Sequence, residues 1–353
     1  MGPSFVRIGD GLGLTWLEPL DAADRSKGYS LRFSRLAQGG WSSPTTIASG
    51  AGFFANWADF PGVGVGNDGT LVAHWLEKTG PDTYAYAVKL ASSRDSGATW
   101  QNAGVLHGDA VDAEHGFVSW VDDSRGARAF WLDGREMPTG GAMALRTRLL
   151  GEAEHVLDPR VCECCQTDAA STDAGPIVVY RDRSDTEVRD IYAVRRTASG
   201  WSEPVRVAGD GWEIPGCPVN GPAVAAAGKK VAVAWFTGGD PGPRVQLAWS
   251  QDRGASFGKP IAIDADNPLG RVDLVLDDDG DALVAWYARD ATGAGLRLRR
   301  VGADGKLGPP ASVAATSAER ASGFPRLVRL GGELYIAWVE AGPPSRVHVR
   351  TFR

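Results

Sequence analysis

Residues 60–77 read Phe-Pro-Gly-Val-Gly-Val-Gly-Asn-Asp-Gly-Thr-Leu-Val-Ala-His-Trp-Leu-Glu. Apolar residues alternate with small or polar ones on the two sides of Asn67-Asp68-Gly69, and these three residue types favour a tight turn. The stretch therefore predicts a β-hairpin whose second strand ends in an aromatic residue, Trp75, followed by a polar one.

This hairpin recurs along the chain. Besides 60–77, its copies occupy residues 5–18, 117–135, 168–183, 222–238, 272–290 and 325–341. The corresponding aromatic residues are Trp16, Trp75, Trp131, Tyr180, Trp235, Trp286 and Trp338. Their mean spacing is about 54 residues, near the period of propeller blades. In most copies a third strand, and often a short fourth, follows.

A unit of this kind cannot bury both of its faces alone, whereas a radial arrangement covers them. We therefore predict one all-β domain over residues 1–353, a β-propeller of four-stranded antiparallel blades. Seven blades are preferred, and six are the alternative if the first and last copies merge. Because no fourth strand follows residues 347–353, we expect the ring to close by borrowing a strand from the N-terminus.

Composition excludes several classes of protein. The net charge of −6 provides no basic surface for nucleic acid. No apolar run approaches the roughly 18 residues that a membrane span needs. The first strand-like segment follows Met1-Gly2-Pro3-Ser4 directly, so no signal peptide is visible in this sequence.

Two short segments carry a family resemblance. Residues 93–100, Ser-Arg-Asp-Ser-Gly-Ala-Thr-Trp, fit the pattern S-x-D-x-G-x-T-W, and residues 250–257, Ser-Gln-Asp-Arg-Gly-Ala-Ser-Phe, fit its looser form. Asp and Ser side chains can bond the turn backbone, and Gly supplies a positive φ. These segments resemble Asp boxes, and with the repeat they make the chain similar to the sialidase-like (BNR/Asp-box) propellers. In that family the box is a structural turn remote from the active site.

In a propeller the innermost strands start, and the second strands end, on one face around the central channel. We call this the channel-mouth face. The repeat places both cysteine-bearing segments on it, in adjacent blades. It also places four polar residues there as candidate ligand contacts: His74, Gln166, Asn220 and Arg326. Three other histidines, His107, His155 and His348, are expected at the surface.

The segment Cys162-Glu163-Cys164-Cys165 permits three interpretations. With Cys217 it can form disulfides, although bonds within so short a run need strained geometry. One cysteine can be an activated catalytic thiol. The preferred interpretation is a metal site of Cys162, Cys164, Cys165 and Cys217, with His115 as an imidazole ligand. Soft thiolates select Cu(I) or zinc, and we prefer copper because the thiolates crowd one side of an open channel mouth. The run from Cys162 to Asp168 also resembles segments of bacterial sialidase-like proteins.

Resemblance to sialidases implies another chemistry: arginines that grip a substrate carboxylate, a Tyr nucleophile with a Glu partner, and an Asp acid/base. Arg135, Arg181, Arg271 and Arg326 are candidates for the grip, since guanidinium groups bind carboxylates with two hydrogen bonds. Asp59 is the candidate acid/base, and Asp182 joins Arg181 in this set or in an internal ion-pair network. The Arg-Ile-Pro motif of sialidases is absent, because Gly9 follows Arg7-Ile8, and no nucleophilic Tyr can be placed.

We therefore expect an extracytoplasmic propeller, periplasmic or secreted, with a thiolate-rich copper or zinc site at the channel mouth. A redox, oxidase or copper-handling role would follow from it. The alternatives are a glycoside hydrolase acting on acidic sugars and a non-catalytic scaffold with structural disulfides. We expect a monomer whose partner at the channel mouth is a small molecule, a peptide or a glycan.

Overall fold

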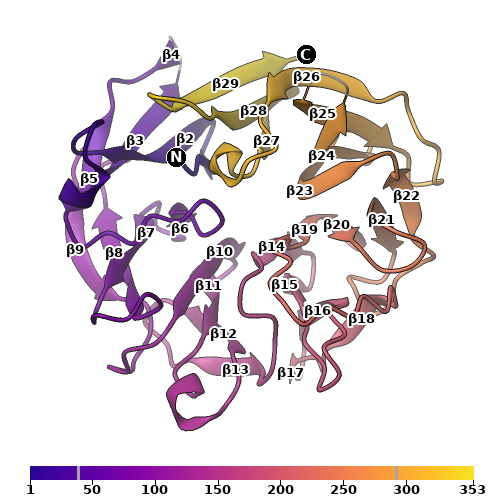
Figure 1. Cartoon of the computed structure of the whole chain (residues 1–353), viewed down its shortest axis with the longest axis horizontal. Helices are drawn as coiled ribbons and strands as arrows, with labels where there is room; N and C mark the ends of the chain where they lie inside the picture. The colour runs from indigo at the N-terminus through magenta and orange to yellow at the C-terminus, as the bar shows by residue number, and fades with distance from the viewer. Residues whose placement is uncertain (38–39, 291–292) are drawn as a thin grey trace.

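The computed structural model describes residues 1–37, 40–290 and 293–353. Seven antiparallel sheets stand around a common centre (Figure 1), and this confirms the predicted seven-bladed propeller. Helical structure among these residues consists of three short 3-10 turns, η1 (Arg25–Lys27), η2 (Met137–Thr139) and η3 (Arg320–Ser322). No helix in the described ranges has the length and apolarity to cross a membrane.

Each blade is a contiguous stretch of chain. The first blade contains β1 (Ser4–Ile8), β2 (Gly11–Pro19), β3 (Tyr29–Ala37), β4 (Gly40–Trp41) and β5 (Thr45–Gly50), and the second contains β6 (Gly62–Val65), β7 (Leu71–Lys78), β8 (Tyr86–Ser93) and β9 (Gln101–Val105). The third blade contains β10 (His115–Asp123), β11 (Gly126–Asp133), β12 (Ala144–Leu149) and β13 (His155–Asp158). The fourth contains β14 (Asp168–Thr172), β15 (Gly175–Arg181), β16 (Ile191–Thr197), β17 (Gly200–Trp201) and β18 (Val205–Ala208).

The last three blades contain β19 (Ala223–Ala227), β20 (Lys230–Thr237), β21 (Arg244–Ser250) and β22 (Ile261–Asp264); β23 (Pro268–Leu276), β24 (Ala282–Asp290), β25 (Gly293–Val301) and β26 (Ala311–Thr316); and β27 (Arg326–Leu330), β28 (Glu333–Glu340) and β29 (Arg346–Phe352). The innermost strands form a closed ring, in which each contacts the next in the order β1, β6, β10, β14, β19, β23, β27 and again β1.

The seven repeated aromatic residues all lie on the second strand of a blade, as the repeat predicted. Three of them also join neighbouring blades. The indole of Trp235 donates to Asp210 at 2.6 Å, and that of Trp286 donates to Asp264 at 2.6 Å, each acceptor lying at or just beyond the fourth strand of the preceding blade. The Tyr180 hydroxyl donates to Asp158 of β13 in the same way. A buried indole N–H or hydroxyl needs a partner, which explains the carboxylates at these positions.

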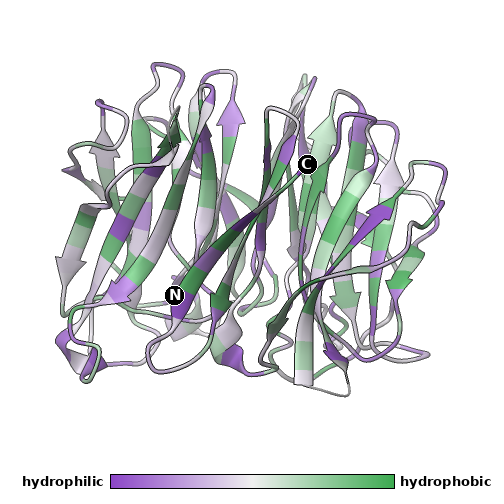
Figure 2. Ribbon diagram, turned by 90° about the horizontal axis from the view of Figure 1, so that it is seen from above, coloured by the Kyte–Doolittle hydropathy of each residue, from purple (hydrophilic) through white to green (hydrophobic). Residues whose placement is uncertain are grey.

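Apolar side chains of adjacent blades pack into clusters between the sheets, one at each of the seven junctions. The junction of the last and first blades is the smallest, with Leu12, Val328 and Tyr335 as its buried members. Figure 2 shows the strands from the side, with loops at their two ends forming the two faces of the ring.

The expected borrowing of an N-terminal strand was wrong. β1 pairs with β2 in the first blade, and the last blade keeps three strands. The physical reason is local: only Gly9 and Asp10 separate β1 from β2, and Gly9 has a φ of +60°. A two-residue loop with a positive φ closes a hairpin at low cost in entropy, so β1 pairs with its nearest neighbour in sequence.

The two Asp-box-like segments form turns between the third and fourth strands of their blades. In the first, the Ser93 hydroxyl accepts from the Gly97 amide at 2.9 Å, and Asp95 accepts from the Thr99 amide and hydroxyl. Gly97 has a φ of +90°, as the pattern predicted. Ser250, Asp252, Gly254 and Ser256 repeat the arrangement. These hydrogen bonds stay within the turn and leave the channel mouth untouched.

Candidate functional site

Several polar side chains around the channel bind the backbone of the next blade. We call four of them, Asp59, Asp168, Asn220 and Asp273, the inter-blade ties. Each accepts one backbone N–H at 2.6–2.9 Å, and the donors are Phe117, Val224, Arg271 and Leu327, respectively. Buried backbone groups require partners, so these residues complete the hydrogen bonding where strands of different sheets meet.

Strained backbone accompanies the ties. Phe117, Val219 and Arg271 have φ values of +52°, +48° and +56°. Such values are unfavourable for side chains with a Cβ and most unusual for a β-branched residue. At Phe117 and Arg271 the strained residue itself donates to a tie, and Val219 precedes one. The surrounding hydrogen bonds therefore hold the chain in this conformation as it enters the inner strands.

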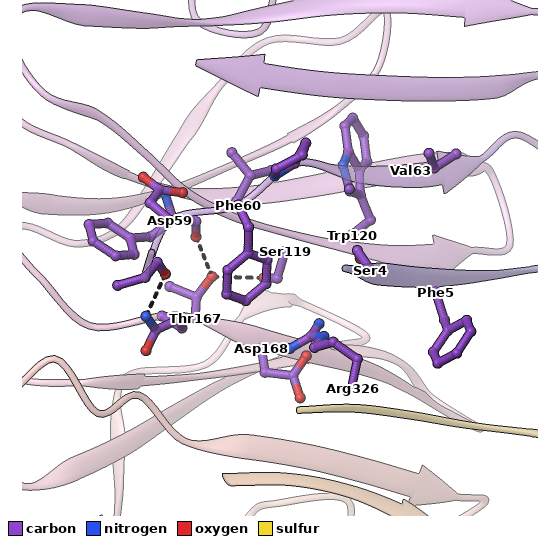
Figure 3. A pocket seen from close by; sticks show the side chains of 16 residues that line it. Ser4, Phe5, Asp59, Phe60, Val63, Ser119, Trp120, Thr167, Asp168 and Arg326 are labelled. Carbon is purple, nitrogen blue, oxygen red and sulfur yellow. Dashed lines mark hydrogen bonds between the residues drawn. The ribbon is translucent and has the colours of Figure 1, made fainter. Parts of the chain in front are cut away.

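A small cavity of about 90 Å³ is lined by two of the ties, Asp59 and Asp168. Figure 3 shows Asp168 and Arg326 facing one another beside it, with Thr167 joined to Ser119 and to the backbone. Burial raises the pKa of Asp168 to about 7, against the opposing charge of Arg326. Burial also raises the pKa of Asp59 well above its usual value. The cavity is comparable in size to a few water molecules.

Three cysteines form what we call the thiolate cluster: Cys162, Cys164 and Cys165. The Cys162 Sγ lies 3.4 Å from that of Cys165 and 3.8 Å from that of Cys164. These are separations of unbonded sulfurs, since a disulfide bond measures about 2.05 Å. Cys162 and Cys165 are buried, and Cys164 is half-buried. The backbone is fixed by the Cys162 amide, which donates to the Arg181 carbonyl of β15.

Positive charge supports the thiolate cluster. The Arg189 guanidinium lies 3.1 Å from the Cys162 Sγ and also binds Glu163 and Glu187. Hydrogen bonds from the Cys164 and Cys165 thiols, together with Arg189, hold the pKa of Cys162 well below its ordinary value. Burial raises the pKa of Cys165 to about 12. Without a bound cation, the cluster therefore favours one thiolate, at Cys162, beside neutral thiols at Cys164 and Cys165.

Two predicted ligands lie outside this cluster. Cys217 is exposed, and its sulfur is not among the grouped ligand atoms. His115 is grouped instead with His107 and Asp109, at the junction of the second and third blades. The predicted five-ligand set is thus divided in the structure. His107 is buried, in contrast to the expected surface position, because its ring stacks on that of His115 at 3.8 Å.

Of the arginines proposed to grip a carboxylate, two are occupied by backbone carbonyls. Arg181 donates to the carbonyls of Asn220, Arg189 and Phe236. Arg271 donates to the carbonyls of Glu319, Gly323 and Ala318. Both side chains are buried, with exposures of 1% and 6%. Both side chains therefore have a structural role, because their hydrogen bonds join backbone segments to one another.

The remaining candidates have varied surroundings. Arg135 forms ion pairs with Asp109, Asp133 and Glu154. Asp182 is half-buried, and burial raises its pKa to about 6. His74 accepts from the Trp120 indole at 2.8 Å, and burial lowers its pKa to about 3, so it stays neutral. Gln166 donates to the Ala58 carbonyl and accepts from the Gly221 amide, a further contact between blades.

A half-buried carboxyl group that was not among the candidates selected from the sequence lies at the channel mouth. Glu114 accepts from the Tyr86 hydroxyl at 2.7 Å. Burial raises its pKa to about 7, with a further contribution from the negative charge of Cys162. A carboxyl group that titrates near neutral pH is suited to donate or accept a proton. The signal available in the sequence was its position immediately before an inner strand.

Comparisons with known proteins identify the fold. No family model matches the chain, and a search of curated proteins finds no match. Among solved structures, an ulvan lyase of polysaccharide lyase family PL25 matches with a TM-score of 0.63 at 12% identity, covering 98% of this chain and 90% of that one. The polysaccharide lyase Uly1 matches with a TM-score of 0.59 at 10% identity, covering 99% and 89%.

A Hadza microbial sialidase, Hz136, matches with a TM-score of 0.50 at 11% identity, covering 93% of this chain and 74% of that one. The chain is thus a β-propeller with the architecture of sialidases and polysaccharide lyases. At these identities the likeness concerns the fold, and function must be argued from the site.

Proposed function

We propose that this protein binds copper, as Cu(I), through the thiolate cluster at the channel mouth of an extracytoplasmic propeller. The supporting observation is that the Cys162 Sγ lies 3.4 Å from that of Cys165 and 3.8 Å from that of Cys164 without a bond, with all three sulfurs within 4.8 Å of one another. A tetrahedral ion with metal–sulfur distances of about 2.3 Å needs sulfurs about 3.8 Å apart, so small side-chain movements would allow all three to bind one ion. A redox, oxidase or copper-handling role would follow.

Copper is preferred to zinc because the cluster supplies three soft ligands. Structural zinc sites almost always have four protein ligands, whereas soft thiolates also select Cu(I). The fourth cysteine is exposed and outside the group, and His115 faces Asp109. Arg189 supports a thiolate at Cys162, the form in which sulfur binds metals.

The test is elemental analysis of protein purified without chelator, combined with a free-thiol count and anaerobic loading with Cu(I). We expect about one copper per chain in the wild type, a strong reduction in Cys164→Ser and no change in Cys217→Ser, whose thiol is exposed and outside the cluster. Absence of bound metal after reductive loading of well-folded protein would exclude the proposal. One zinc and no copper would correct the identity of the ion.

A second candidate function is supported by Glu114 and Tyr86. A carboxyl group with a pKa of about 7, hydrogen-bonded to a phenol at the channel mouth, could serve as acid or base on a glycan. The architecture shared with polysaccharide lyases and sialidases is compatible with such a ligand. We would assay acidic polysaccharides for cleavage and a fluorogenic sialoside for hydrolysis. Activity lost in Glu114→Gln and retained in Cys164→Ser would support this function in place of the first.

A further inference from the structure

A second group of metal-ligating side chains lies apart from the thiolate cluster. We call His107, Asp109 and His115 the imidazole cluster. His107 and Asp109 belong to the loop between β9 and β10, and His115 is the first residue of β10. The carboxylate Oδ2 of Asp109 lies 2.9 Å from His107 Nδ1 and 3.3 Å from His115 Nε2. Two imidazole nitrogen atoms from the ends of this short segment thus converge on one oxygen.

The polar atoms of the imidazole cluster do not all have hydrogen-bond partners. His115 Nδ1 lies 3.2 and 3.1 Å from the carbonyl oxygens of Tyr86 and Ala113, which can only accept, so Nδ1 carries the hydrogen. In a neutral imidazole Nε2 then has a lone pair. That lone pair faces a carboxylate, which is also an acceptor, at a fully buried position. The Nε2 atoms of both His115 and His107 are buried without a hydrogen-bond partner.

The surrounding charges favour an added cation. Three carboxylates, Asp109, Asp133 and Glu154, face two guanidinium groups, Arg135 and Arg146. One negative charge therefore remains uncompensated while both imidazoles are neutral. The carboxylates of Asp109 and Glu154 are only 13% and 14% exposed, so water compensates this charge in part. A cation among the three ligand atoms would neutralise the excess charge and separate the two facing acceptors.

We propose that the imidazole cluster is a binding site for a divalent cation of the zinc type, separate from the thiolate cluster. Two imidazoles and one carboxylate are a common zinc ligand set. With ligand distances of about 2.0–2.1 Å, tetrahedral ligands lie about 3.4 Å apart, near the observed 3.3 Å between His115 Nε2 and Asp109 Oδ2.

Binding requires one side-chain movement. The two rings are stacked with an interplanar angle of 5°, so their lone pairs lie in parallel planes. A rotation of the His107 side chain would bring its Nδ1, which lies 2.9 Å from Asp109 Oδ2, toward an ion held by Asp109 and His115. His107 lies between Leu106 and an exposed Gly108, and Ala110 is also exposed, so the loop gives the ion access from solvent.

The site is tested by titrating Zn²⁺ and Co²⁺ into Cys164→Ser protein, which keeps the imidazole cluster intact. We expect one ion to bind without the near-ultraviolet charge-transfer absorption of a cobalt–thiolate bond. Asp109→Asn and His107→Gln should each weaken binding by at least about 100-fold, since even residues outside the ligand set cost 10–100-fold. Asp112→Asn, an exposed carboxylate on the same loop, is the matched control and should bind as the parent does.

Circular dichroism of each variant confirms that it is folded. Failure of the Cys164→Ser protein to bind either ion would overturn the proposal, as would unchanged binding in folded Asp109→Asn. The outcome is independent of the thiolate cluster: if that cluster binds no copper, the ion lost in Asp109→Asn still identifies the imidazole site.

Discussion

The inter-blade ties and the two clusters occupy the same end of the propeller, yet their polar atoms are used differently. Each tie accepts a backbone N–H of the next blade at 2.6–2.9 Å. The clusters bring possible metal-ligand atoms together instead: sulfurs 3.4 Å apart in one, and a nitrogen facing a carboxylate in the other. Position at the channel mouth alone therefore does not separate the two kinds of residue, whereas the groups that their polar atoms face do.

The largest expected effect separates metal binding from stability. Cys165→Ser should weaken copper binding by about 100-fold or more, because structural metal sites contribute roughly 10–16 kcal/mol over about four ligands. The free energy of unfolding of the metal-free protein should change little, since Ser has nearly the shape of Cys. Cu(I) competition titration and denaturant unfolding measure the two quantities. Equal metal affinity in Cys165→Ser and Cys217→Ser would erase the distinction between cluster and ties.

The reverse pattern is expected for a tie. Asp273→Leu removes the acceptor of the Leu327 amide and should lower the free energy of unfolding by about 1–3 kcal/mol, the cost of a buried donor without a partner. Asp273→Asn keeps an oxygen at that place and should be tolerated. Copper content should be the same in both variants. A loss of copper in folded Asp273→Leu would show that the ties also shape the cluster.

A third prediction concerns the pH dependence of the free energy of unfolding, to which Asp168 contributes. Burial raises the pKa of Asp168 in the folded protein to about 7, above its ordinary value of 3.8. Between these values the folded state binds more protons than the unfolded state, so this contribution to stability is lost as the pH rises. Asp168→Asn, which keeps the acceptor for Val224, should reduce the slope by at most about 1.4 kcal/mol per pH unit. Urea unfolding from pH 4 to pH 8 measures it, and parallel slopes for the two proteins would contradict the raised pKa.

The smallest effect is expected in the turns away from the channel mouth. Ser93→Ala removes the acceptor of the Gly97 amide and should cost about 1 kcal/mol of stability. Neither copper nor zinc binding should change. Ser43→Ala, at an exposed position, is the control. If Ser93→Ala altered metal affinity, the turns could no longer be treated as purely structural.

The fold was predictable because its information is local. Alternating apolar residues and a recurring aromatic residue such as Trp235 define one strand pair, and repetition defines the ring. The pairing of β1 was mispredicted because alternation identifies a strand but not its partner, and the loop of Gly9 and Asp10 decided the matter. In the turn at Ser93–Trp100, the side-chain bonds of Ser93 and Asp95 and the positive φ of Gly97 were predicted, since these features lie within eight residues.

The sites were only partly predictable. The repeat correctly placed Cys162, Cys164 and Cys165 together, because they are close in sequence. It could not show that His115 faces Asp109, nor that Cys217 stays exposed, because both depend on how loops of different blades fold. His107 was wrongly expected at the surface, because the sequence does not show that its ring stacks on that of His115. The spacing of His107, Asp109 and His115 along one loop was the available signal.

The small apolar cluster between the last and first blades has a mechanical consequence. No strand of the described residues is shared between any two blades, and this junction has the fewest buried apolar side chains, Leu12, Val328 and Tyr335. We expect the two blades to separate at this junction while the hydrogen bonds between strands within every sheet remain. Such an opening would move β1 and β27, the inner strands of the first and last blades, away from each other. Amides at this junction should then exchange with solvent earlier than those at the other junctions, and the channel would gain a lateral entrance without loss of any blade.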